Sequence, residues 1–186
     1  DVIDYSGLEH DGMFLEGTGA LVLDHVARIA YTAQSNRANP VALERFCTHF
    51  NFEPMAFATA DAQGQACYHT NVMLCVGTEF ALGGFYLIAD AKRRGAVRER
   101  LREGGRELSG LDAWQIGEFA GNALELSGRS GERLLALSER ACASLSAAQK
   151  AAIERSATLL PLAVPTIELA GGSVRCMLAG IHLARR

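Results

Sequence analysis

Hydrophobic and polar positions along the chain alternate between short β-like runs and longer helical stretches, in an order that recurs. Two apolar runs at 20–24 and 26–32 predict a pair of strands around a turn. Pro40 then opens a predicted helix through about Asn51, because proline is tolerated at the first helical position. A further apolar run at 54–60 predicts a third strand, so this part of the chain indicates a strand–strand–helix–strand unit.

The same order continues further along. In the second unit, the runs at 66–76 and 79–89 predict strands, and 91–104 predicts an exposed helix with Arg and Glu spaced for i,i+4 pairing. In the third unit the pattern predicts, in chain order, a short helix at 112–119, strands at 123–126 and 133–137, a helix from the cap Ser146 to about 159, and strands at 163–169 and 174–182. Pro161 is expected to end the helix that Ser146 begins.

A short phrase recurs along this framework at a nearly fixed interval. Its versions are GTGAL at 17–21, TNVML at 70–74, GNAL at 121–124 and GSVR at 172–175. With Thr18, Thr70, Asn122 and Ser173 as anchor positions, the steps are 52, 52 and 51 residues. Fixed self-similarity predicts one supersecondary unit used several times, and units of this length can close into a ring.

The chain contains between three and four such units, which predicts an incomplete ring. We expect one α/β domain over residues 1–186, because no long linker interrupts the pattern. The chain begins with Asp rather than Met, close to the first anchor. We therefore expect it to be the later part of a longer protein whose first units are missing here.

Composition narrows the possible partners. The 186 residues are 49% hydrophobic and 21% charged, which is ordinary for a globular protein with a sizeable core. A net charge of −3 without a basic stripe argues against nucleic acid, and the lack of an apolar run of transmembrane length argues against a membrane partner. Five cysteines without a CxxC pair argue against disulfides or structural zinc and favour reduced thiols in a cytoplasmic protein.

Three side chains suited to nucleophilic catalysis lie within three residues of an anchor: Glu16, His69 and Cys176. If the units pack around an axis, these side chains converge there. A cysteine nucleophile must be a thiolate, and His69 is a better partner than Arg175 because neighbours in a strand point to opposite faces. The Glu16 carboxylate would then orient the imidazole and stabilise its positive charge.

Structural alternatives exist for these residues. A lone cysteine in an apolar run is often an inert core thiol, and a lone histidine is often a hydrogen-bonded core residue. The repeat register places all three side chains at matching positions, and this favours the catalytic interpretation.

These residues lie in the segments FLEGTG, YHTNVM, FAGN and GGSVRCML. Their order and spacing resemble the guanidino-group modifying superfamily of amidinotransferases, arginine deiminases and dimethylarginine dimethylaminohydrolases. The resemblance covers nearly the whole chain and is closest to bacterial amidinotransferase-related proteins called citrulline utilisation hydrolases. It implies the pentein fold, a pseudosymmetric α/β propeller of five ββαβ units, of which this chain lacks the first blades.

The resemblance also implies a reaction. Cys176 is the nucleophile that attacks the central carbon of a guanidino or ureido group, and His69 is the general acid/base. Glu16 supports the histidine and the substrate. A covalent thio-intermediate forms and water hydrolyses it, so that neither a metal nor an organic cofactor is required.

Position 71 departs from the pattern of the arginine deiminases and amidinotransferases. Those proteins carry Asp two residues after the histidine, where it holds a cationic guanidinium, whereas this chain has Asn71, which supplies no countercharge. This favours a neutral ureido group such as that of citrulline, with arginine derivatives left open. Asn122 and Arg37 complete the candidate substrate-binding residues, although Asn122 could instead tie a turn and Arg37 could instead brace its blade.

Two other functions stay open. The same intermediate could pass its amidino group to an amine rather than to water, because access to the pocket selects the second nucleophile. A propeller without catalysis could serve as a binding module, which would not need a Cys–His–Glu set. The expected partner is a small guanidino or ureido amino acid, and a homo-oligomer is left open.

Overall fold

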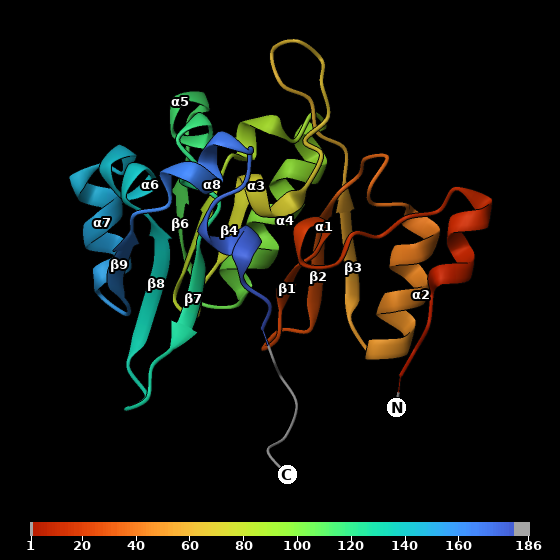
Figure 1. Cartoon of the computed structure of the whole chain (residues 1–186), viewed down its shortest axis with the longest axis horizontal. Coiled ribbons are helices and arrows are strands. Elements are labelled where there is room, and N and C mark those ends of the chain that lie inside the picture. The colour runs from red at the N-terminus through yellow and green to blue at the C-terminus, as the bar shows by residue number, and fades with distance from the viewer. Residues whose placement is uncertain (1, 181–186) are drawn as a thin grey trace.

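The computed structural model describes residues 2–180, and these contain three consecutive copies of one strand–strand–helix–strand unit (Figure 1). The first unit comprises β1 (Val22–Asp24), β2 (Ile29–Ala33), α2 (Pro40–Phe50) and β3 (Glu53–Phe57). The second comprises β4 (Leu74–Val76), β5 (Phe80–Gly83), α4 (Ala91–Glu103) and β6 (Glu107–Gly110). The third comprises β7 (Leu124–Ser127), β8 (Arg133–Ser138), α7 (Ala147–Glu154) and β9 (Thr158–Leu162).

Shorter helices precede, connect and follow these units. In chain order they are η1 (Ser6–Asp11), α1 (Gly17–Ala20), α3 (Thr70–Met73), η2 (Phe85–Leu87), α5 (Ala113–Gly117), α6 (Glu139–Ser144), α8 (Pro165–Leu169) and η3 (Val174–Met177). The anchors of the repeat fall on α1, on α3, on the turn after α5 and at the start of η3. The repeated phrase therefore marks the segments around which the units are arranged.

Each sheet pairs its strands in the same way. In the first, β1 and β2 are antiparallel with Val22 opposite Tyr31, and β2 and β3 are parallel with Tyr31 opposite Met55. Parallel pairing needs a crossover connection, which α2 supplies. The pairs β5–β6 and β8–β9 are also parallel, with α4 and α7 in their crossovers. The ββαβ unit predicted from the repeat is confirmed.

The first strands of the units lie next to one another, because β1 contacts β4 and β4 contacts β7. Figure 1 shows three separate small sheets arranged side by side, with helices between them, rather than one continuous sheet. This is the arrangement of an incomplete ring, as the repeat predicts.

Two apolar clusters join neighbouring units. In the first, a face of the first sheet packs against Val97 and Leu101 of α4. In the second, Leu82 of β5 packs against Leu135 of β8 and Ile153 of α7. The helices α4 and α7 therefore fill the space between successive sheets, and α2 covers the other face of the first sheet.

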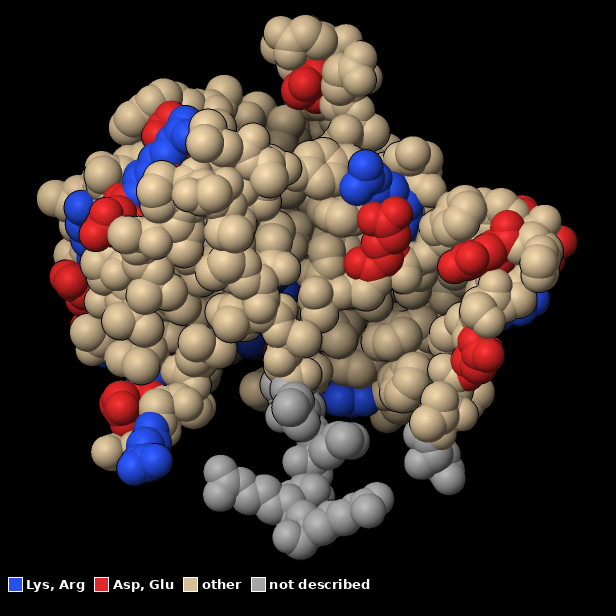
Figure 2. Space-filling model, in the orientation of Figure 1, with Lys and Arg blue, Asp and Glu red and all other residues tan. Residues whose placement is uncertain are grey.

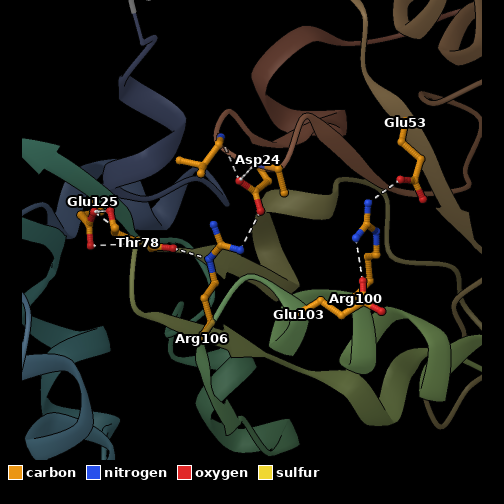
Figure 3. Close-up of polar contacts among 10 residues, drawn as sticks. Asp24, Glu53, Thr78, Arg100, Glu103, Arg106 and Glu125 are labelled. Carbon is orange, nitrogen blue, oxygen red and sulfur yellow. Dashed lines mark hydrogen bonds and ion pairs between the residues drawn. The ribbon is translucent and has the colours of Figure 1, made fainter.

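A buried ion pair also links the first two units, at the end of β1 (Figure 3). A terminal nitrogen of Arg106 lies 2.7 Å from Asp24 Oδ2, and the two side chains are only 4% and 1% exposed. Arg106 Nε also donates to the carbonyl of Gly77 at 2.6 Å, and Asp24 Oδ1 accepts the backbone N–H groups of Val26 and Ala27. Several polar partners thus compensate the burial of both charges.

An exposed ion pair recurs at the outer edge of the units. Arg100 of α4 pairs with Glu53, the first residue of β3, as Figure 3 shows, and Arg155 after α7 pairs with Glu107, the first residue of β6. In both cases a helix of one unit contacts the outer strand of the preceding unit, so the contact follows the repeat.

Several helix boundaries agree with the sequence. The helix predicted from Pro40 is α2, with the Asn39 side chain accepting the backbone N–H of Val41, and the helix predicted at 91–104 is α4, which Asp90 caps. Ser146 is the N-cap of α7, as predicted, but α7 ends at Glu154 rather than near 159. Pro40, the spacing of charges along 91–104 and the cap Ser146 were sufficient to place the starts of these helices.

Other predicted elements are wrong. Pro161 does not end a helix but lies in β9, at the edge of its sheet, where a residue without an N–H is tolerated. The run at 163–169 was expected to be a strand, yet Pro165 opens the short helix α8 there. The helix α6, which Ser138 caps, was not predicted as a separate element.

The strand predicted at 66–76 is confirmed only in part. Residues 70–73 form the helix α3, because Thr70 Oγ1 donates to the carbonyl of Ala20 at 2.5 Å and accepts the N–H of Ala33 at 2.7 Å. The strand predicted at 174–182 is likewise replaced by the 3-10 helix η3 over Val174–Met177, and its last two residues lie outside the described part of the chain. Contacts between units, which a local pattern does not carry, set both conformations.

Charged side chains are scattered over the face shown in Figure 2, without a continuous basic stripe. Across residues 2–180, no helix has the length and apolar character needed to cross a membrane.

Candidate active site

Hydrogen bonds join each anchor segment of the repeat to the next one along the chain. Thr70 Oγ1 donates to the carbonyl of Ala20, Asn122 Nδ2 donates to the carbonyl of Asn71 at 3.2 Å, and the N–H of Arg175 donates to Asn122 Oδ1 at 3.1 Å. Each anchor segment therefore touches the next one across a boundary between units. This chain of contacts brings together side chains that are far apart in the sequence.

This arrangement brings the side chains of Glu16 and His69 into contact. Each residue occupies the position just before a short helix, Glu16 before α1 and His69 before α3. Glu16 Oε2 lies 2.7 Å from His69 Nε2. A side chain at Gly19 would collide with the imidazole, since an added Cβ would lie 2.7 Å from Nδ1. The absence of a side chain there lets the histidine lie over α1.

Arg37 and Tyr68 extend this pair. A terminal nitrogen of Arg37 lies 3.6 Å from Glu16 Oε2, and its guanidinium lies over the Tyr68 ring, 5.2 Å from the ring centroid. The Arg37 and Glu16 side chains are 45% and 43% exposed. An arginine and a carboxylate are therefore both open to solvent beside a half-buried histidine.

Cys176 lies in η3 with its thiol exposed. Asn122 Nδ2 lies 3.3 Å from the sulfur, and Asn71 Nδ2 lies 3.6 Å from it. Gly172 passes close to this cysteine, because an added Cβ would lie 3.3 Å from Cys176 Cβ. Amide groups from the second and third units thus converge on the sulfur of the last anchor.

Two links join the cysteine to the histidine pair. Asn71 follows His69 by two residues and reaches the sulfur, and the Tyr68 hydroxyl donates to the carbonyl of Gly171 at 3.2 Å. Within residues 2–180, no direct hydrogen bond is present between the Cys176 sulfur and the imidazole. The three candidate catalytic residues therefore share one region through these intermediaries.

The side-chain amide of Asn71 has a partner at only one end in residues 2–180. The residue is 1% exposed, its Nδ2 faces the sulfur, and its Oδ1 is buried without a hydrogen-bond partner in the described part of the chain. A buried acceptor without a partner is rare and costs free energy, so it calls for an explanation. It can accept an N–H group from a molecule bound beside the sulfur.

The other thiols have a different environment. Burial raises the pKa of Cys47 and of Cys67 to about 11, and it raises the pKa of Cys75 to about 12. These three thiols therefore stay protonated at neutral pH, whereas Cys176 is the cysteine whose side chain is open to solvent. Among residues 2–180, no three or more His, Cys, Asp or Glu side chains gather in a potential metal site.

Sequence reasoning overlooked two residues of this region. Arg175 was set aside because neighbours in a strand face opposite ways, but the segment is a 3-10 helix, and the Arg175 side chain is buried and donates to the carbonyl of Ala123. Tyr68 gave no signal apart from its place next to His69. Both contacts depend on a backbone conformation that the apolar pattern did not predict.

An open groove of about 630 Å³ adjoins this region. Residues of all three units and of the last segment line it, among them Leu21, Val76, Leu124 and Arg175. Glu16, His69 and Cys176 are not among its lining residues. The groove therefore borders all three units, and it is distinct from the surface where the histidine and cysteine lie.

Comparisons with known proteins agree with this architecture. Residues 1–183 match a family model described as "N,N dimethylarginine dimethylhydrolase, eukaryotic". A comparison with curated protein sequences finds no significant match.

Several solved structures have a similar fold. Apo ArgZ, an arginine dihydrolase from the ornithine–ammonia cycle in cyanobacteria, has a TM-score of 0.68 at 16% identity, over 88% of this chain and 24% of that one. The N-terminal domain of an ArgZ variant covalently bound to a reaction intermediate has a TM-score of 0.67 at 16% identity, over 88% of this chain and 55% of that one. AgrE with ornithine and NAD⁺ has a TM-score of 0.69 at 15% identity, over 88% of this chain and 22% of that one.

This chain thus spans about a quarter of full-length ArgZ and about half of its N-terminal domain. The likeness confirms the predicted pentein fold, here as an incomplete α/β propeller. On the family match, the chain belongs to the N,N-dimethylarginine dimethylhydrolase family, within the superfamily of proteins that modify guanidino groups.

Proposed function

We propose that this protein is a cysteine-dependent hydrolase of a C–N bond in a guanidino or ureido compound. The observation that carries the proposal is the placement of an exposed sulfur against the Asn71 amide, whose buried oxygen has no partner among residues 2–180. A substrate N–H bonded to that oxygen would hold its central carbon near the sulfur. The Glu16–His69 pair, reached through the same short segment, would supply proton transfer.

The first half of the reaction makes a covalent intermediate. The Cys176 thiolate attacks the central carbon, a C–S bond forms, and the bond from carbon to the departing nitrogen breaks. His69, as imidazolium, donates the proton that the departing nitrogen needs. Glu16 stabilises that imidazolium through the contact of 2.7 Å between its Oε2 and His69 Nε2.

The second half releases the product. Neutral His69 takes a proton from water, the resulting hydroxide attacks the same carbon, and the C–S bond breaks to regenerate the thiolate. The exposure of Cys176 supports access for water to this intermediate. The same exposure would admit an amine, which is the alternative of an amidinotransferase.

Residues around the sulfur support a choice of substrate class. Asn71 supplies no negative charge, and Arg175 is a buried cation on the residue next to the nucleophile. Within the described chain, no carboxylate forms an ion pair with Arg175. This environment favours a neutral ureido group over a cationic guanidinium. Arg37 is open to solvent and suits the carboxylate of an amino-acid substrate.

Two solved relatives point to arginine-like compounds as the substrate class. ArgZ is an arginine dihydrolase, and AgrE has been crystallised with L-arginine and with ornithine. Arginine, citrulline and dimethylarginine are therefore the substrates to compare in this protein.

Product release and thiol trapping test the proposal together. The wild-type protein is expected to release ammonia or an alkylamine from one of these compounds, and Cys176→Ala and His69→Ala are expected to abolish the release. A haloacetamidine should label Cys176 in preference to the other four thiols, and His69→Ala should remove that preference. Labelling of all five thiols at equal rates, with no turnover of any compound, would overturn the proposal.

An added amine separates hydrolysis from transfer. A hydrolase forms the same products at the same rate when glycine is present, whereas a transferase yields a new amidino compound. A clear preference for arginine over citrulline would contradict the argument from Asn71, without touching the assignment of Cys176.

A further inference from the structure

The side chain of Tyr68 contacts both ends of the candidate site. Tyr68 directly precedes His69, the residue that leads into α3, and its side chain is partly exposed. The guanidinium of Arg37 lies over its ring, 5.2 Å from the ring centroid, and its hydroxyl donates to the carbonyl of Gly171 at 3.2 Å. One side chain therefore reaches from the first unit to the segment that carries the cysteine.

Several contacts hold Arg37 at one end of this side chain. The Ser35 hydroxyl donates to the carbonyl of Tyr68 at 2.9 Å and accepts the N–H of Arg37 at 3.1 Å, so it joins the two backbones. The N–H of Glu16 donates to the carbonyl of Arg37 at 3.1 Å. A cation over an aromatic ring is attracted by the π electrons of that ring. The position of the Arg37 guanidinium therefore depends on the Tyr68 ring as well as on the Glu16 carboxylate.

The hydroxyl of Tyr68 meets the turn that carries the nucleophile. Gly171 follows the end of α8 with a φ of +86°, a conformation that glycine adopts without strain. The next residue, Gly172, lies against the cysteine, since an added Cβ there would be 3.3 Å from Cys176 Cβ. The N–H of Cys176 also donates to the carbonyl of Ser173 at 3.0 Å. The hydroxyl is therefore bonded to a turn whose position determines where the sulfur lies.

Tyrosine is suited to hold two such points at a constant separation. Its ring and hydroxyl oxygen form one rigid group, so little conformational freedom is lost when it is held in place. The imidazole of His69 packs against this ring, with the centroids 5.0 Å apart, and limits its rotation. The separation between the Arg37 guanidinium and the turn of Cys176 is therefore set in large part by Tyr68.

That separation matters for a substrate with two binding groups. An amino acid with a ureido or guanidino group must place its carboxylate on a cation and its central carbon at the sulfur. The number of methylenes between these groups sets the length of the molecule. Arg37 and Cys176 are the residues that the proposed function gives to the two contacts. A side chain that fixes their separation also fixes the length of substrate that fits.

We propose that Tyr68 is a positioning residue that selects the chain length of the substrate, because it fixes Arg37 relative to the turn of Cys176. The inference deepens the proposed function and rests on it, since it takes Arg37 as the carboxylate site and Cys176 as the nucleophile. A tyrosine that served only the stability of the fold would affect substrates of every length alike. A change in the ratio between lengths therefore distinguishes the two roles.

The test measures binding of a homologous series without turnover. In a Cys176→Ala background, calorimetry gives dissociation constants for citrulline, for arginine and for the homologues of each that are one methylene shorter or longer. With Tyr68 intact, we expect the preferred length to bind about tenfold or more tightly than its neighbours, the usual effect of one methylene. Tyr68→Leu removes both the ring and the hydroxyl, and the ratio is expected to fall below about threefold. Tyr68→Phe keeps the ring under Arg37 and loses only the bond to Gly171, so an intermediate ratio is expected.

Tyr5→Leu, in the same background, is the matched control. The hydroxyl of Tyr5 also donates to a backbone carbonyl, that of Arg45 at 3.3 Å, and its ring also lies beside a histidine, His49, with the centroids 6.2 Å apart. These contacts join the start of η1 to α2, outside the candidate site, so the ratio should stay at its original value. If Tyr68→Leu does not fold, as judged by its circular dichroism, the ratio in Tyr68→Phe decides the test.

The outcomes separate this inference from the proposed function. A ratio that falls in the Tyr68 variants, but not in Tyr5→Leu, supports the inference even if the wild-type protein hydrolyses none of the compounds. An unchanged ratio in the folded Tyr68 variants overturns it, even in a protein whose hydrolase activity is established. It is also overturned if Tyr5→Leu lowers the ratio equally, if all lengths bind alike while Tyr68 is intact, or if no compound of the series binds.

Discussion

At the scale of residues, the candidate site depends on close packing around a few polar groups. The imidazole of His69 lies against Gly19, and the sulfur of Cys176 lies against two amides. Neither arrangement is a property of one residue, because each partner comes from a different repeat unit. Small changes beside these groups should therefore alter reactivity more than stability.

Gly19→Ala tests the close approach of the histidine. The added Cβ would lie 2.7 Å from His69 Nδ1, so the imidazole must move from its position beside Glu16. We expect kcat/KM to fall by about 10²-fold, the usual cost of displacing a catalytic group by about 1 Å. Gly7→Ala is the matched control, because no atom of residues 2–180 lies within 4 Å of an added Cβ there. Equal kinetics in the two variants would show that the imidazole position does not matter.

The buried thiols predict loss of stability at alkaline pH. Burial raises the pKa of Cys75 from 9.0 to about 12, so the folded chain holds this proton more tightly than the unfolded chain does. The contribution of protonated Cys75 to the free energy of unfolding is complete below pH 9.0 and decreases as the pH rises toward about 12. Urea midpoints at about pH 8 and pH 10.5 would measure the decrease, which should be smaller in Cys75→Ala. An equal decrease in that variant would assign the effect to other groups.

Some of the site could be predicted from the sequence. The repeat register placed Glu16 and His69 at matching positions, and the two residues are in contact. It could not predict that Arg175 is buried beside Cys176, because this follows from a 3-10 helix in place of the expected strand. An apolar run is equally compatible with both conformations, and the bond from the Arg175 N–H to Asn122, a contact between units, leaves no local signal in the sequence.

At the scale of elements, helices with strong local signals were predictable and the shortest helices were not. Pro40 and Ser146 mark the starts of α2 and α7, where capping satisfies free backbone N–H groups. The four-residue helix α3 is too short to be stable by itself. Contacts of Thr70 with the first unit hold it, so a reading of local propensity assigned it to a strand.

Gly95→Ala tests the contribution of propensity within α4. Gly95 is exposed in the middle of this helix, and an added Cβ would have nothing within 4 Å. We expect the free energy of unfolding to rise by about 1 kcal/mol, because glycine is that much worse than alanine in a helix. Gly131→Ala makes the same change at a φ of +86° and should instead lower stability. Denaturant titration of both variants would check the opposite signs.

At the scale of the molecule, the repeat predicted the arrangement of the units but not the contacts that join them. A period in the sequence indicates equivalent units, whereas the residues at their boundaries are free to differ. The boundary of the first and second units has the buried pair of Asp24 and Arg106, and that of the second and third has Glu125, which accepts from Thr78 (Figure 3). The order of the units follows from the period, and the strength of their boundaries follows from such individual contacts.

The buried pair predicts the largest loss of stability among the single changes considered. Arg106→Met leaves the Asp24 carboxylate buried without its cation, and we expect a loss of about 3–5 kcal/mol in the free energy of unfolding. Arg140→Met breaks the exposed pair with Glu118 and should cost far less, because solvent screens this pair. Combining Asp24→Asn with Arg106→Met should recover part of the loss, because the uncompensated charge is then removed. If the double variant were no more stable than Arg106→Met, the cost would come from packing at this boundary rather than from the unpaired carboxylate, and the two units would be joined mainly by their apolar cluster.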